Sequence, residues 1–283
     1  MTGNLELAAP TWFVGCGNMA SAILDGWRLA EVDISGLTVI RPSGTPVEGV
    51  RTVKTLAEAG PSPQLVLLAF KPQRLDEIAP GLRQRLSAKT IVVSILAGVE
   101  TLSLRDRFPG AGAIVRAMPN LAVAIRRGVT GLFSTDADEA AREQVGNLFS
   151  ALGFAMWMAD EGKLAALGSV AGAGPAYVAR FIAALAKAAV RRGLSEEIAA
   201  TIARETVLGT AWLAATTGED MDSIARRVAS PNGTTEAGLA VLDREHVLDE
   251  LIAVTIEAAA RRGAELAEQA RVGSSLADAT RLS

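Results

Sequence analysis

The sequence predicts a doubly wound, mostly parallel α/β sheet followed by an all-helical domain, and two observations support this. In the first part of the chain, short apolar runs alternate with amphipathic stretches, such as residues 21–30 and 74–86. Apolar runs separated by helices are typical of parallel strands that are covered on both faces. From about Asp160 onward the sequence has no strand pattern, and long alanine-rich segments follow.

The strands and the domain boundary can be placed from this pattern. The apolar runs predict strands at residues 12–14, 37–40, 65–70, 91–95, 113–116, 129–133 and 154–158. Strands that alternate with helices form βαβ units, which build an open sheet. We therefore expect a sheet domain over residues 1–159 and a helical domain over residues 160–283.

The helical half has clear boundary signals. Residues 163–192, 196–217 and 247–271 are long and rich in alanine. Ser195 is a good N-cap for the second segment, and Gly218 is placed to end it. These helices have small side chains and would make a thin bundle in a monomer. Their apolar stripes either form an ordinary core or are buried against a second copy. We favour the second interpretation and predict a dimerisation domain, as a homodimer or a higher oligomer of dimers.

Composition limits the class of protein. The chain has 283 residues, a formal net charge of −3 and one cysteine, Cys16. This excludes a disulfide framework and favours a reducing compartment. The N-terminus does not resemble a signal peptide, and no uncharged apolar run reaches the roughly 18–20 residues of a membrane span. No basic run indicates nucleic acid, and the lone His246 makes a metal site unexpected. We expect a cytoplasmic protein without membrane or nucleic-acid partners.

The first predicted turn has the pattern of a dinucleotide site. Gly15, Gly17 and Ala20 match G-x-G-x-x-G/A between a predicted strand and a predicted helix. Gly15 permits the tight turn, Gly17 lets backbone amides approach a pyrophosphate, and Ala20 keeps helix and strand close. A glycine turn without a ligand is the alternative. The context favours a Rossmann-like fold whose cofactor-binding residues include Cys16, with Asn18 and Met19 beside it. We interpret Cys16 as a small filler rather than a reactive thiol.

The end of the second predicted strand indicates which cofactor binds. An NAD site usually has an acidic residue there, whereas this chain has Arg41, Pro42 and Ser43. Arg41 would attract a 2′-phosphate, and Ser43 would donate a hydrogen bond to it. The alternative is a solvated arginine at a strand end. We therefore predict NADP as cofactor, with NADPH preferred and NADH possible.

Several further segments carry a resemblance to a known family. They are VLLAFKPQ (66–73), VVSILAGV (92–99), VRAMPN (115–120), GAGPAY (172–177) and SPNGTT (230–235), which follow GCGNMA (15–20) in the same order. Together they resemble the pyrroline-5-carboxylate reductases from about residue 11 to residue 266. The resemblance implies NADPH-dependent reduction of the cyclic imine 1-pyrroline-5-carboxylate to L-proline, the last step of proline biosynthesis.

Strand-end positions in these segments are expected to bind the cofactor. Open α/β sheets bind ligands at the carboxyl ends of their strands. The residues that we assign there from the resemblance are Ala69, Lys71, Pro72, Ser94, Ala97 and Asn120. Asn120 would hydrogen-bond the ribose or the carboxamide. Taken singly, each segment is equally consistent with an ordinary turn.

The segment 230–236 is the predicted substrate site. It ends one helix and begins another, so amides and threonine hydroxyls converge where a small carboxylate could bind. A plain helix cap is the alternative. The resemblance implies that Ser230, Gly233 and Thr234 hold the substrate, and that Thr235 is the catalytic hydroxyl near the imine nitrogen. Gly174 and Glu219 are assigned to the same site, although Glu219 equally suits a solvated helix end.

The chain departs from the family pattern at several positions, which leaves alternatives open. The differences are at Leu56, Gly168–Ser169, Leu121–Ala122, Ala173 and Asn232, and most replace a polar group. One alternative is a reductase of a different small cyclic imine. A second is a β-hydroxyacid dehydrogenase-like enzyme, for which Lys163 and Lys187 lack the expected neighbours. A third is an NADP-binding protein without turnover.

Overall fold

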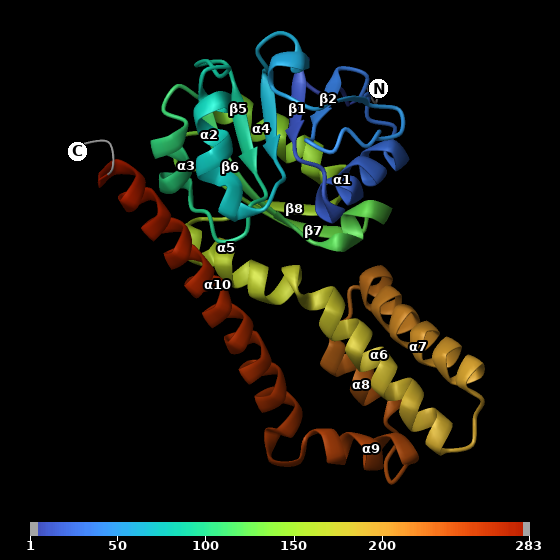
Figure 1. Cartoon of the computed structure of the whole chain (residues 1–283). Helices are drawn as coiled ribbons and strands as arrows, with labels where there is room; N and C mark the ends of the chain where they lie inside the picture. Colours follow the sequence, from blue (N-terminus) through green and yellow to red (C-terminus); the bar gives the residue numbers. More distant parts are fainter. Residues whose placement is uncertain (1–4, 280–283) are drawn as a thin grey trace. The chain divides into compact units, whose positions relative to one another are not determined.

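The computed structural model of the chain describes residues 5–279 (Figure 1). Contacts divide the chain into two compact units. The first comprises the chain up to Ala173 together with the stretch from Ala259 onward, and the second comprises Gly174–Ala258.

The first unit contains one eight-stranded sheet with the strand order β3-β2-β1-β4-β5-β6-β7-β8. The strands are β1 (Thr11–Val14), β2 (Leu37–Ile40), β3 (Arg51–Val53), β4 (Leu65–Leu68), β5 (Ile91–Ser94), β6 (Ala113–Pro119), β7 (Gly128–Phe133) and β8 (Gly153–Trp157). The pairings from β3 through β6 are parallel, β6 and β7 are antiparallel, and β7 and β8 are parallel. The order reverses at β1, which is the doubly wound arrangement that the sequence predicts.

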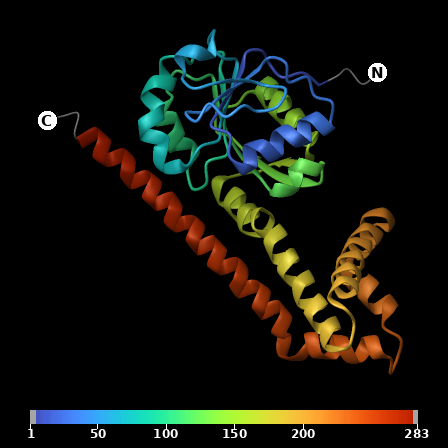
Figure 2. The same ribbon diagram turned by 45° about the vertical axis from the view of Figure 1, so that its right-hand side comes forward.

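Helices cover both faces of this sheet (Figure 2). They are α1 (Asn18–Leu29), α2 (Leu75–Arg83), α3 (Thr101–Arg107), α4 (Glu139–Ser150) and α5 (Glu161–Leu167). Alternate residues of β1 belong to different cores, because Phe13 packs with α1 and α4 whereas Trp12 and Val14 pack with α2 and α3. Burial on both faces explains why the strands are continuously apolar in sequence.

One strand, β3, is missing from the sequence-based prediction. It has only three residues, and only Val53 is buried, so it carries little apolar signal. It pairs in parallel with β2 and forms the edge of the sheet. Its significance is that it brings a further strand end next to Arg41.

The second unit is helical, as predicted. It contains α6 (Gly174–Arg191), α7 (Glu196–Thr217), α8 (Met221–Val228), α9 (Thr234–Leu242) and the start of α10 (Val247–Ala279). Ser195 caps α7 by accepting a hydrogen bond from the Ile198 amide at 3.4 Å, and Gly218 ends it with a left-handed φ of 72°. The predicted segment 163–192 is divided, because a π-helical turn at Gly168–Gly172 (η4) separates α5 from α6.

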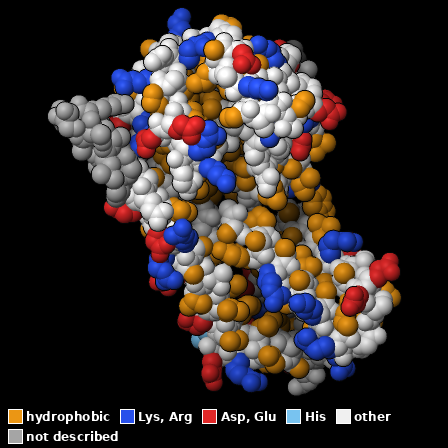
Figure 3. All heavy atoms as spheres, viewed as in Figure 1, with side chains coloured by type: hydrophobic (Ala, Val, Ile, Leu, Met, Phe, Trp, Pro, Cys, Tyr) orange, Lys and Arg blue, Asp and Glu red, His pale blue; other side chains and the backbone are white. Residues whose placement is uncertain are grey.

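Hydrophobic side chains remain exposed on this helical unit (Figure 3). Among its described residues only Ala199, Ala203 and Ile224 are buried apolar side chains, whereas Phe181 and Trp212 are 52% and 54% exposed. The helical stretch Glu161–Arg191 is also long and apolar enough to cross a membrane, by length and composition alone. Exposed apolar surface on this scale needs a covering partner.

Candidate functional site

The predicted cofactor residues gather at one edge of the sheet. Gly15 follows β1, Arg41 follows β2, Ala69 follows β4, and Ser94 and Asn120 lie at the ends of β5 and β6. These strands are parallel, so their carboxyl ends meet at the same edge. This is the edge at which open α/β sheets bind ligands.

The turn after β1 requires glycine at its first position. Gly15 has a φ of 86°, and its amide donates to the Ile40 carbonyl at 2.8 Å. A Cβ atom at Gly15 would lie 2.5 Å from the Ala69 carbonyl oxygen, which is far inside van der Waals contact. The absence of a side chain therefore lets the β1 and β4 ends lie side by side.

The next glycine leaves open space at the start of α1. Gly17 is the N-cap residue of α1, with extended backbone and no side-chain cap, and a Cβ atom there would meet no heavy atom within 4 Å. No acidic residue occupies the first turn of α1. The helix N-terminus thus offers uncapped amides and a partial positive charge, which fit a pyrophosphate. Ala20 is 1% exposed and fills the contact between helix and sheet.

The other residues of this turn differ in accessibility. The Cys16 side chain is buried, and its Sγ lies 3.6 Å from the Ser21 hydroxyl, in agreement with a space-filling role. Asn18 is exposed as the first residue of α1, whereas Met19 packs against the core. Asn18 is therefore the side chain of the turn that a ligand can reach most directly.

A hydrogen-bonded turn with no carboxylate follows β2. The Arg41 amide donates to the Val53 carbonyl at 2.9 Å, and the Gly44 amide returns to the Arg41 carbonyl at 2.9 Å. The Ser43 hydroxyl oxygen accepts from the Thr45 amide and hydroxyl, at 3.3 and 3.0 Å. The Ser43 hydrogen remains available as a donor, as a phosphate would require.

The segments after β4 and β5 contain exposed residues, and a buried serine ends β5. Lys71 is exposed, and Pro72 opens the short 3₁₀ turn Pro72–Arg74. Ala97 is exposed, whereas Ser94 is 2% exposed and accepts from the Leu96 amide at 3.3 Å. The structure therefore gives the Ser94 hydroxyl a framework role in the turn, while Lys71 and Ala97 stay predicted cofactor contacts.

The loop after β5 also contacts the last helix. Gly98 has a φ of 75°, and a Cβ atom there would lie 2.9 Å from the backbone carbonyl carbon of Leu266 in α10. Only a residue without a side chain permits this approach. Gly98 and Leu266 are 168 positions apart in the chain, and nothing in the sequence marks them as neighbours.

The Asn120 side chain, predicted to contact the cofactor, has two partners within the fold. It is buried, accepts from the Val129 amide at 3.2 Å, and donates to the Ala171 carbonyl at 3.1 Å. The amide group thus ties the ends of β6 and β7 to the π-helical turn η4. Both polar atoms therefore have a backbone partner, which gives Asn120 a framework role, and its contact with the cofactor stays a prediction.

A buried ion pair between β6 and α5 was not predicted from the sequence. Arg116 on β6 pairs with Glu161, the first residue of α5, and the two side chains are 7% and 27% exposed. Glu161 also accepts from the amide and hydroxyl of Thr101 at 2.8 and 2.7 Å. On the same side of β6, a Cβ atom at Gly168 would lie 2.0 Å from the Met118 sulfur. Residues two apart on β6 therefore fasten the segment from α5 to η4.

The predicted substrate loop is a tight turn before α9. The Gly233 amide donates to the Ser230 carbonyl at 2.9 Å, and a Cβ atom at Gly233 would lie 2.4 Å from the Ser230 hydroxyl. Asn232 has a left-handed φ of 58°, which asparagine tolerates better than most residues. Asn232, one of the departures from the family pattern, therefore suits its place in this turn.

The start of α9 exposes the amides that the sequence predicts. Gly233 is the N-cap residue and provides no side-chain cap, so the first-turn amides of Thr234 and Thr235 remain available to an anion. Thr234 is exposed, and Thr235 is half-buried. Glu236 points its carboxylate back, and this group accepts from the Asn232 amide at 2.6 Å.

The remaining predicted substrate residues lie elsewhere in the helical unit. Glu219 is half-buried and forms an ion pair with Arg227 at 2.9 Å, and it also contacts the Thr217 hydroxyl. These contacts support the alternative role of Glu219 at a helix end, which the sequence left open. Gly174 begins α6, and a Cβ atom there would have open space around it.

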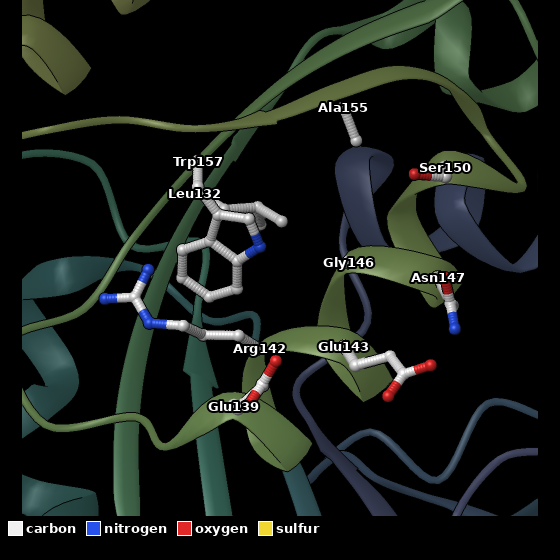
Figure 4. Close-up of a pocket in the computed structure, with 9 residues that line it drawn as sticks. All are labelled: Leu132, Glu139, Arg142, Glu143, Gly146, Asn147, Ser150, Ala155 and Trp157. Carbon is white, nitrogen blue, oxygen red and sulfur yellow. The ribbon is translucent and has the colours of Figure 1, made fainter.

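A pocket of about 380 Å³ lies over α4 and β8 (Figure 4). Its wall includes Arg142, whose guanidinium lies 4.6 Å from the Trp157 ring centre. Arg142 also donates to the backbone carbonyls of Ser134 and Ala137. Arg142 therefore already has partners, and the pocket contains no predicted site residue.

Comparisons with known proteins agree with this architecture. Residues 12–98 match the family described as NADP oxidoreductase, coenzyme F420-dependent, and residues 161–266 match pyrroline-5-carboxylate reductase dimerisation. The chain is 34% identical over 264 residues to the pyrroline-5-carboxylate reductase of Pseudomonas aeruginosa, covering 91% of this chain and 96% of that one. The chain belongs to the pyrroline-5-carboxylate reductase family.

Solved structures of family members superpose on the whole fold. A pyrroline-5-carboxylate reductase from Coxiella burnetii is 31% identical, with a TM-score of 0.83 over 92% of this chain and 99% of that one. The Plasmodium falciparum pyrroline carboxylate reductase, crystallised with NADP bound, is 21% identical, with a TM-score of 0.82 over 94% of this chain and 100% of that one. The fold of this chain is therefore also similar to that of a protein with a more distant sequence.

Proposed function

We propose that the protein reduces 1-pyrroline-5-carboxylate to L-proline with NADPH, as the last step of proline biosynthesis. The observation that carries this proposal is membership of the pyrroline-5-carboxylate reductase family over 91% of the chain. The uncapped turn at Gly15–Gly17 and the non-acidic end of β2 support the choice of cofactor. NADPH, when bound, supplies the hydride that the imine carbon receives.

The residues of the chain have to hold a small anionic ring and keep its nitrogen protonated. We assign the carboxylate to the first-turn amides of α9 with Ser230, Gly233 and Thr234, and the imine nitrogen to the Thr235 hydroxyl. A cyclic imine brings its own proton, so no histidine or strong acid is required. Placing the imine carbon within about 3–3.5 Å of the hydride donor accounts for much of the catalysis in such a reaction.

The remaining assignments are also proposals. Three exposed residues of the sheet edge, Asn18, Lys71 and Ala97, and the half-buried Arg41 are assigned to the cofactor. Gly174 and Glu219 are assigned to the substrate side. We keep residues 1–159 as the NADP-binding domain and residues 160–283 as the helical domain that binds substrate and self-associates.

We further propose a cytoplasmic homodimer whose exposed helical faces meet a second copy of the chain rather than lipid. The match of residues 161–266 to the family's dimerisation part supports this. Multi-angle light scattering in detergent-free buffer should give twice the 29.4 kDa chain mass, or an even multiple of it. A monomer, or a protein that requires detergent, would contradict the proposed assembly.

The reaction itself is tested by NADPH oxidation with three imines. 1-Pyrroline-5-carboxylate, its six-membered homologue and carboxylate-free pyrroline separate the proposed substrate from the alternatives. Preference for the six-membered ring would favour the other imine reductase that the departures at Leu121 and Ala173 leave open. NADPH binding without reduction of any imine would favour a protein that has lost turnover.

A further inference from the structure

An unassigned lysine lies next to the predicted phosphate-binding arginine. Ile40 and Val53 are a register pair of the parallel strands β2 and β3, and Arg41 and Lys54 are the residues that follow them. Neighbouring strands are about 4.8 Å apart, so the two strand ends bring both residues to one corner of the sheet. The unpredicted strand β3 is what places Lys54 there.

The turn after β2 makes room for the Lys54 side chain. Gly44 has a left-handed φ of 65°, and a Cβ atom there would lie 2.5 Å from the Cε of Lys54 and 3.1 Å from its Cγ. The methylene chain of Lys54 therefore runs across the face of Gly44. This contact directs Lys54 along the same turn that contains Arg41 and Ser43.

The backbone of Lys54 is fixed by an acidic neighbour. The Glu58 carboxylate accepts from the Thr55 hydroxyl at 2.8 Å and from the Lys54 amide at 3.2 Å. These hydrogen bonds, with a smaller contribution from the charges of Lys54 and Arg51, hold the pKa of Glu58 below its ordinary value. Arg51, the other cation nearby, is already bound to the carbonyls of Glu58 and Ala59. The Arg51 guanidinium is thus occupied by backbone carbonyls, and the backbone of Lys54 is held in place by Glu58.

At this corner neither Arg41 nor Lys54 forms a direct ion pair with a described residue, and the Glu58 carboxylate acts on the Lys54 charge only from a distance. Within residues 5–270, neither the Arg41 side chain nor the Lys54 ammonium group takes part in an ion pair or a hydrogen bond. The positive charges of Arg41 and Lys54 repel each other. A bound dianion would attract both side chains and so offset this repulsion. The Ser43 hydroxyl adds a donor on the same turn.

We infer that Lys54 is a specificity-determining residue that binds the 2′-phosphate of NADPH together with Arg41 and Ser43. The inference rests on the proposed NADP site, and it concerns the choice between NADPH and NADH rather than the imine. Lys54 contributes the second positive charge that a phosphate dianion needs, and NADH has no group for it to contact.

The test measures binding rather than turnover, so it does not depend on the imine substrate. Isothermal titration calorimetry gives the Kd of NADP⁺, NAD⁺ and the fragment 2′,5′-ADP for the wild type and for Lys54→Met. Loss of one charge-assisted contact should raise the Kd of NADP⁺ and of 2′,5′-ADP about tenfold, which corresponds to ~1.4 kcal/mol. The Kd of NAD⁺ should change less than about twofold.

Two further variants complete the design. Lys89→Met makes the same change near the amino end of β5, on the opposite edge of the sheet, and should leave all three Kd values unchanged. Lys54→Arg should retain the preference for NADP⁺, because it keeps the charge. Equal weakening of NADP⁺ and NAD⁺ by Lys54→Met, or no weakening of either, would overturn the inference. Failure of imine reduction with an intact NADP⁺ preference would instead count against the proposed reaction alone.

Discussion

Loss of the Glu161 charge should destabilise the protein measurably. Glu161→Gln keeps the shape of the side chain and the acceptor for Thr101, but it leaves the buried Arg116 guanidinium without a counter-charge. Breaking a buried ion pair on one side costs about 3–5 kcal/mol. Because the Glu161 side chain is 27% exposed, water partly replaces the lost charge, and we expect about 2–3 kcal/mol.

Thermal unfolding followed by circular dichroism measures this effect. For a chain of this size about 1 kcal/mol corresponds to ~2–4 °C, so Tm should fall by roughly 5–10 °C. Glu77→Gln makes the same chemical change in the exposed Arg74–Glu77 pair and should shift Tm by about 2 °C or less.

A double substitution separates charge from shape. Arg116→Met in the Glu161→Gln background removes the unpaired cation and should recover at least half of the lost Tm. Arg116→Met alone should cost less than Glu161→Gln, because Glu161 keeps two hydrogen bonds from Thr101 and some contact with water. If Glu161→Gln is as stable as the wild type, or the double variant is no better than the single, the pair does not fasten α5 to the sheet.

The other predictions concern the site and one helix cap. Thr235→Val should reduce imine reduction at least tenfold and leave the Kd of NADPH within about twofold, because the hydroxyl is assigned to the substrate nitrogen; equal losses in both would contradict that role. Gly15→Ala should abolish NADPH binding in fluorescence titrations, since its Cβ would lie 2.5 Å from the Ala69 oxygen; tight binding by this variant would place the pyrophosphate elsewhere. Arg41→Asp should shift the ratio of kcat/KM values from NADPH towards NADH, and an unchanged ratio would remove Arg41 from the site. Hydrogen bonds from Ser223 hold the pKa of Asp220 below the ordinary aspartate value, so its contribution to capping α8 is complete above the unfolded-state pKa and is lost as the pH falls through the lowered one; an NMR titration that finds an ordinary pKa would refute the cap.

Much of the fold could be predicted because its signals are local. The ends of α7 match residues 196–217, since Ser195 and Gly218 are a cap and a stop that act within one turn. The glycine turn at Gly15 was equally predictable, because a strand, a turn and a helix follow one another within a few residues. Strand β3 was missed because three residues with one buried side chain carry too little periodicity.

The contacts that connect distant segments were not visible in the sequence. Arg116 and Glu161 are 45 positions apart, and nothing in their neighbourhoods marks them as partners. Asn120 was assigned to the cofactor because an asparagine at a strand end suits either a ligand or a turn, and only the structure reveals Val129 and Ala171 as its partners. Lys54 could not be linked to Arg41 until β3 was known to pair with β2.

An isotope experiment tests the proposed reaction most directly. The protein is incubated with 1-pyrroline-5-carboxylate and NADPH deuterated on the transferable face of the nicotinamide, and the product is analysed by mass spectrometry. We expect L-proline with one deuterium at the former imine carbon, and about tenfold lower kcat/KM with NADH. Proline without deuterium from NADPH labelled on either face, or no proline while NADPH remains bound, would contradict the proposed reaction.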